Sequence, residues 1–174
     1  TTQKNDDTVA LRQLNTDLNV YSLSTGYTVF VDSWSFATSL NVNGQQTTNS
    51  NGLNNFASTN YLLTENISFS FPLNLGLSYG IVESESSVGY RIINSMEVNA
   101  SYPLAAFLQA NAGLNLAAER GQSDRFGFFA AAYLMLSEAL NLNIRAEKTT
   151  YSDAVLMSNS YDEFIFSATL TSRW

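Results

Sequence analysis

The stretch that decides the fold is LAAFLQANAGLNL, residues 104–116. Every second position from Leu104 to Leu116 is apolar. Most of the positions between them are small or polar, namely Gln109, Asn111, Gly113 and Asn115. Successive side chains of a β-strand point to opposite faces of a sheet, so a period of two predicts a strand with one apolar and one polar face.

The same alternation recurs along the chain, in residues 34–43, 73–81, 140–147 and 164–174. Over these five stretches one face is apolar at 25 of 27 positions and the other at 4 of 24, although the whole chain is only 45% apolar. Weaker alternation adds four more strands. We predict nine strands, at residues 18–30, 34–44, 56–71, 73–82, 89–102, 104–117, 126–136, 139–148 and 163–174. Glu65 interrupts the apolar face of the third strand and predicts a bulge or a shift of register there.

The connections alternate in length. Short links fall near 31–33, 72–73, 103 and 137–139, and longer polar ones fall at 44–55, 83–88, 118–125 and 149–162. Short turns at one rim and long loops at the other are typical of a membrane barrel. The predicted fold is therefore all-β, an antiparallel up-and-down transmembrane β-barrel.

Composition excludes several functions. The net charge of −7 and the absence of any basic run argue against nucleic-acid binding. The chain has no His and no Cys, which removes a Ser-His-acid triad and a thiolate metal site. We expect no enzyme activity, no cofactor and no metal. The longest apolar run, Phe128 to Leu136, is too short for a membrane-spanning helix.

The polar face supplies the candidate lumenal residues of such a barrel. They are Arg91, Glu97, Gln109, Asn111, Asn141, Asn143, Arg145, Glu147 and Arg173. Arg145 and Glu147 lie two residues apart, roughly 6–7 Å along one face of a strand. Three interpretations stay open for these charges: a hydrogen-bonded ladder that fills the lumen, a charged constriction that sets ion selectivity, and an acid–base pair.

Aromatic residues gather at the predicted strand ends, as in the two aromatic girdles of membrane barrels. One set is Trp34, Phe71, Tyr102 and Trp174, and the other is Tyr90, Phe126 and Phe164. Alternation also fits a soluble or periplasmic barrel that carries hydrophobic ligands, in which the apolar face would point inward. That carrier is the alternative interpretation.

The C-terminal segment resembles the closing strand of Gram-negative outer membrane β-barrel proteins. Apolar residues occupy alternate positions from Phe164 to Leu170, Ser172 departs from the pattern, and the chain ends in Trp174. The resemblance implies a location in the outer membrane, contact with its lipid, and recognition of the last strand by the barrel assembly machinery. The resemblance does not specify a function. For a barrel of this kind we expect a polar pore or a membrane-anchoring scaffold for other outer membrane or surface proteins.

With a periplasmic C-terminus, nine crossings place residues 1–17 outside the cell as a polar segment, followed by barrel strands over 18–174. Bacterial single-chain barrels have an even strand number. We therefore expect either one strand fewer than counted or a larger barrel to which this chain contributes.

Overall fold

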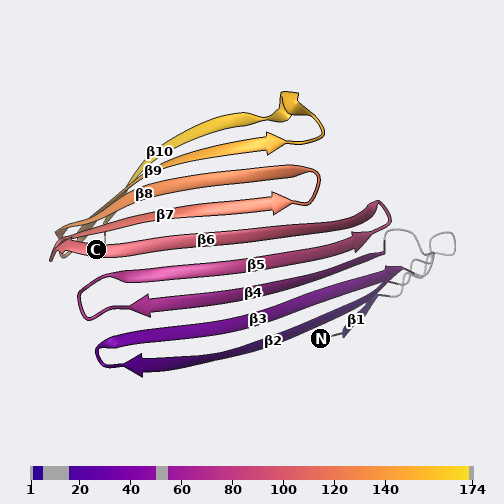
Figure 1. The fold of residues 1–174 in the computed structure, drawn as a ribbon, viewed down its shortest axis with the longest axis horizontal. Coiled ribbons are helices and arrows are strands. Elements are labelled where there is room, and N and C mark those ends of the chain that lie inside the picture. Colours follow the sequence, from indigo (N-terminus) through magenta and orange to yellow (C-terminus); the bar gives the residue numbers. More distant parts are fainter. Residues whose placement is uncertain (1, 6–15, 50–54, 173–174) are drawn as a thin grey trace.

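The computed structural model describes residues 2–5, 16–49 and 55–172. They form one ten-stranded antiparallel sheet in which the strands follow one another in chain order (Figure 1). The strands are β1 (Thr2–Asn5), β2 (Thr16–Val31), β3 (Trp34–Asn49), β4 (Phe56–Ser68), β5 (Asn74–Ser86), β6 (Gly89–Ala105), β7 (Leu108–Glu119), β8 (Ser123–Ser137), β9 (Leu140–Asp153) and β10 (Tyr161–Ser172). A short 3-10 helix, Met157–Asn159, lies in the β9–β10 connection.

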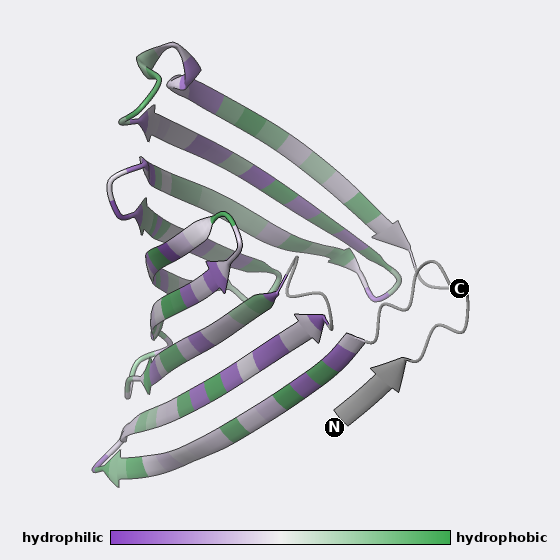
Figure 2. Ribbon diagram, turned by 90° about the vertical axis from the view of Figure 1, so that its right-hand side faces the viewer, coloured by the Kyte–Doolittle hydropathy of each residue, from purple (hydrophilic) through white to green (hydrophobic). Residues whose placement is uncertain are grey.

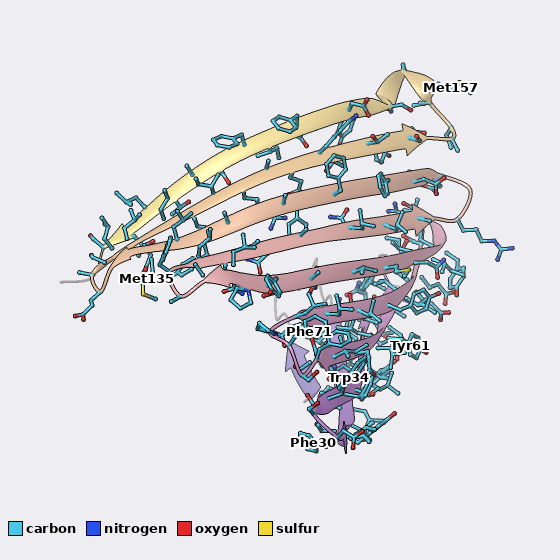
Figure 3. The ribbon with its side chains drawn as sticks, turned by 60° about the vertical axis from the view of Figure 1, so that its left-hand side comes forward. Phe30, Trp34, Tyr61, Phe71, Met135 and Met157 are labelled. Atoms are coloured by element: carbon cyan, nitrogen blue, oxygen red, sulfur yellow. The ribbon has the colours of Figure 1, made fainter. Side chains whose placement is uncertain are left out.

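All nine predicted strands are present, and the all-β meander is confirmed. The predicted rhythm of the connections is observed only in part. Tight links such as the one between Val31 and Trp34 are present, but the predicted long loop at 83–88 is a two-residue link, 87–88, and the predicted short link at 72–73 spans residues 69–73. Figure 3 shows the two ends through Met135, at the tight links, and Met157, in the connection at the opposite end. The one addition is β1, which pairs with the first residues of β2.

Three details of the prediction are wrong. The turn predicted at Pro103 lies at residues 106–107, and Pro103 belongs to β6, where it pairs with Gln109. Glu65 causes neither a bulge nor a shift, because its register with β3 and β5 is continuous. Register shifts occur instead next to turns, between Pro103 and Ala105 and between Met135 and Ser137. Phe71 lies in the link between β4 and β5 rather than in a strand.

The register places the apolar positions of neighbouring strands opposite one another. One cross-strand row, for example, joins Val98, Leu114 and Phe128 on β6, β7 and β8. Because directly paired residues share a face of the sheet, the alternation of each strand adds up to one apolar and one polar face. Figure 2 shows the alternation as bands along the strands of a curved sheet.

No described segment covers the apolar face. Among the described residues no apolar side chain is fully buried, whereas Leu23, Phe166 and Leu170 on this face are each more than 60% exposed. A soluble domain rarely leaves an apolar surface of this extent in water. The sheet therefore has the composition of a wall between an apolar medium and a polar one.

The polar face is the crowded, concave side. Thr149, on this face, is only 2% exposed. Neighbouring side chains lean over its glycines: a Cβ at Gly113 would lie 2.5 Å from the Phe129 ring, and one at Gly127 would lie 2.3 Å from Asn115 Oδ1. Side chains converge on the inside of a curved sheet, so glycine makes room there. The apolar face is accordingly convex.

Candidate functional site

The predicted lumenal residues share the polar face. The ladder places Glu97 opposite Asn115, Arg145 opposite Ala131 and Glu147 opposite Phe129, all on that face. The remaining predicted residues of the set lie there too, namely Arg91, Gln109, Asn111, Asn141 and Asn143. Arg173 lies outside the described residues.

Near the end of the strands with the longer connections, Arg91 forms an ion pair with Glu119. Its Nε and Nη2 donate to the two carboxylate oxygens at 2.5 and 2.7 Å. Such a two-point contact fixes the guanidinium in one orientation. Sequence reasoning missed Glu119, because it fell in a predicted loop, although β7 continues to this residue.

A second charged pair lies further along the strands. Arg145 Nη2 donates to Glu147 Oε2 at 2.9 Å, as the spacing of two residues predicted. The Arg145 guanidinium also lies 4.2 Å from the centroid of the Phe129 ring, a cation–π contact. Phe129 in turn covers Gly113. Arg145 is thus held by a carboxylate and by an aromatic face.

Amides and hydroxyls link the strands between these charges. Gln109 Nε2 donates to Ser101 Oγ at 2.6 Å and to Asn111 Oδ1 at 3.4 Å. Ser39 and Thr64 join β3 to β4 at 2.5 Å. Asn141 Oδ1 is buried and has no protein partner among the described residues. The face thus carries a polar network, with small side chains that keep it open.

A shallow hollow of about 500 Å³ lies on the polar face. Glu97 and Arg125 stand on its border, and Ser78, Asn115 and Ala117 belong to its lining. Arg125 was not predicted as a site residue, since it lay at the end of a predicted loop.

Aromatic side chains cluster at the rim with the tight links. The rings of Trp34 and Phe69 meet edge to face with centroids 4.5 Å apart, and Phe69 stacks on Phe71 at 5.2 Å. Tyr102 lies near the same end of β6. Tyr90, Phe126 and Phe164 lie near the other ends of their strands. These aromatic residues thus lie toward opposite ends of the strands, and their role as membrane girdles stays a prediction. Trp174 lies outside the described residues.

In the described ranges no three Asp, Glu, His or Cys residues gather in a group that could hold a metal ion. No helix within those ranges is long and apolar enough to cross a membrane.

No protein-family model matches the chain, and a search of curated proteins gives no significant match. Solved structures do match. The chain is similar to an outer-membrane-expressed OmpT of Vibrio cholerae, with a TM-score of 0.58, 9% identity, 97% of this chain covered and 60% of the other. It is also similar to a loop L8 deletion mutant of OmpT, described as an outer membrane protein of Vibrio cholerae, with a TM-score of 0.55, 10% identity, and coverages of 90% and 62%.

These matches concern the fold, because identity near 10% carries no finer comparison. The chain spans about 60% of the length of the two structures. The expected resemblance to outer membrane β-barrel proteins is confirmed at the level of fold. The chain has the fold of part of an outer membrane β-barrel.

Proposed function

We propose that this sheet is part of the wall of an outer membrane β-barrel that encloses a polar passage. The observation that carries the proposal is the division of its faces. The convex face is apolar and uncovered, whereas the concave face carries the network of paired charges and amides. A barrel in lipid needs this arrangement, with its apolar surface outward and its polar surface toward the lumen.

The free edges of the sheet favour a barrel with more strands than the ten described here. Among the described residues β10 pairs with β9 alone, so its other edge has a row of free backbone groups. Each unpaired backbone group in hydrocarbon destabilises the protein by roughly several kcal/mol. Further strands that join β10 to the other edge would close the wall. A barrel of more than ten strands has room for water between its side chains.

The carrier interpretation fits less well. A carrier of hydrophobic ligands would shield its apolar face and line a cavity with it. Here Leu63, Phe128 and Leu170, all on the apolar face, are 45–61% exposed, whereas the shielded Thr149 is on the polar face. An anchoring scaffold for partner proteins has no specific contact to support it, and assembly-machinery recognition of β10 stays a prediction.

The test uses the full-length protein, refolded in detergent and placed in a planar lipid bilayer. We expect stepwise ion conductance from a protein whose unboiled form migrates differently from its boiled form on a denaturing gel. A folded, heat-modifiable barrel without conductance would contradict the polar passage, and the anchoring scaffold would then be the remaining function. Folded protein that stays in solution without detergent would overturn the membrane barrel itself.

A further inference from the structure

The lumenal charges divide into paired and unpaired groups. Arg91 is held by Glu119, and Arg145 by Glu147 and the Phe129 ring. In the part of the chain that the structure describes, the Arg125 side chain has no hydrogen bond or ion pair. Glu97 has no ion pair there and accepts a long bond of 3.4 Å from Asn99 Nδ2. Glu97 and Arg125 thus keep their strongest interactions available, and both line the same hollow. Glu163, another polar-face carboxylate without an ion pair among the described residues, lies on β10, away from that hollow.

The register fixes the separation of Glu97 and Arg125. Glu97 pairs with Asn115 on β7, and Arg125 pairs with Ala117, two residues further along the same strand. The two residues are therefore two strand spacings apart and offset by two residues, which gives about 12 Å between their Cα atoms. Charge-assisted hydrogen bonds are about 2.8 Å long. A direct contact would require both side chains to lie flat across β7.

The floor between the two charges is low. Ala117 contributes only a methyl group to the lining between them, and Ser95, which pairs with Ala117, is also small. Asn115 is the bulkiest nearby side chain on β7, and it leans over Gly127 on β8, away from Glu97. A compact solute could therefore lie on the sheet with one end at Glu97 and the other at Arg125.

We propose that this hollow binds small zwitterionic solutes of the amino-acid class, with the solute carboxylate on Arg125 and its ammonium group on Glu97. The proposal rests on the polar passage proposed above and names the solutes that the passage favours. A simple anion or cation satisfies one of the two charges, whereas a zwitterion satisfies both and carries no net charge into the lumen.

The probe is L-alanine, added to single channels of the full-length protein in a bilayer. We expect a dose-dependent reduction of the current, and a much smaller one with acetate or methylammonium at equal concentration. Saturation-transfer NMR of the L-alanine methyl group, on the detergent-folded protein, measures binding independently of conductance.

Variants locate the site. We expect Glu97→Gln and Arg125→Gln each to weaken L-alanine binding about fivefold, the size of one exposed charge contact. The exchanged double variant, Glu97→Arg with Arg125→Glu, keeps one charge of each sign beside the hollow and should bind L-alanine in the reverse orientation. Lys148→Gln is the matched control, since it removes one positive charge from the apolar face.

The outcomes separate the two proposals. An absence of conductance with L-alanine binding intact would contradict the passage alone. Conductance with equal responses to L-alanine, acetate and methylammonium would overturn the zwitterion site alone. The site is also wrong if both single variants bind L-alanine like the parent, or if the exchanged variant binds no better than the single variants.

Discussion

Glu65 and Lys148 interrupt the apolar face in one and the same cross-strand row, five strands apart. The row runs from Glu65 on β4 through Leu77, Val98, Leu114 and Phe128 to Lys148 on β9. Their surroundings differ. Glu65 accepts a hydrogen bond from the Thr38 hydroxyl, whereas Lys148 is flanked by Phe128 and Phe164. Two charges at the same row therefore have different energetic roles, and each can be tested.

Removal of the hydroxyl beside Glu65 should destabilise the sheet. Thr38→Val leaves the Glu65 carboxylate without its donor on an apolar face, at an expected cost of about 1–3 kcal/mol in the free energy of unfolding. Urea denaturation of the refolded protein in detergent measures it. The control is Thr38→Val combined with Glu65→Leu, which should recover most of the loss. A double variant no more stable than the single one would contradict a Glu65-centred explanation.

Lys148→Leu should instead leave the protein as stable or make it slightly more stable. Cations on the lipid face cost about 2–4 kcal/mol at the bilayer midplane and about 0–1 near its surfaces. The next row above Lys148 carries Thr150 and Asp162, so this lysine lies near the edge of the apolar band. We expect a gain of up to about 1 kcal/mol by the same denaturation assay. A clear loss of stability would reveal that Lys148 binds an anionic group.

Gly113 and Gly127 should respond differently to substitution by alanine. A Cβ at Gly113 meets the Phe129 ring at 2.5 Å and the Val98 carbonyl oxygen at 2.8 Å, so both a ring and backbone must move. At Gly127 it meets only atoms of the Asn115 side chain within 3.1 Å, and that side chain can rotate away. We predict a loss of about 1–3 kcal/mol for Gly113→Ala and a smaller one for Gly127→Ala. The reverse order of the two melting temperatures would contradict this packing.

The lumenal ion pair between Arg91 and Glu119 should contribute little to stability. The Arg91 side chain is 54% exposed, and water and salt weaken an exposed pair of this kind. Arg91→Gln, Glu119→Gln and the double variant should therefore unfold at nearly the same urea concentration as the parent. Because Gln at one position leaves a lone charge at the other, the single variants should change the cation-to-anion permeability ratio in opposite directions. The double variant should restore it, and reversal-potential measurements in a salt gradient test this.

The connection after β9 should stay ordered well into acid conditions. The Asp153 carboxylate, at the loop end of β9, accepts the backbone N–H groups of Val155 and Leu156 at 2.8 Å each. These bonds, followed by the amide of Asn159, hold the pKa of Asp153 below its ordinary 3.8. A lowered pKa means that this stabilisation is complete above the ordinary pKa and is lost as the pH falls through the lowered one.

Amide hydrogen exchange at Val155 and Leu156 reports this stabilisation directly. Protection should persist below pH 3.8 in the parent protein and disappear only at lower pH. Asp153→Asn should reduce protection already at neutral pH and remove its acid dependence. Glu138→Gln, in the tight link between β8 and β9, is the control and should change neither. Equal protection in the Asp153 variant would show that the loop depends on other contacts.

The alternation of apolar and polar residues was sufficient to predict the strands, their faces and most of the residues on the polar face. It failed where the alternation in the sequence and the backbone hydrogen bonds of the strand end at different residues. Leu104, Ala106 and Leu108 continue the alternation through a turn, so the reversal at 106–107 left no signal in the sequence. Pro103 indicated the turn three residues too early.

Glu119 and Arg125 were missed for the opposite reason. The ladder between β7 and β8 continues to Glu119 and Ser123, beyond the level where the outer face must be apolar. Past that level the sequence reads as a loop although the backbone is still paired. The hollow is lined by residues of the five strands from β4 to β8, so it depends on their mutual register, which the pattern of any one strand does not contain.

The order of the strands also determines how the sheet can assemble. Each strand from β1 to β10 pairs with the strands that adjoin it in the sequence, so every pairing closes only a short length of chain. Short closures are fast and cost little entropy. The sheet can therefore grow one hairpin at a time, and an error in one hairpin is corrected by separating two neighbours. We expect the slow step to be the pairing of the two outermost strands of the complete barrel, because these strands are far apart in the sequence.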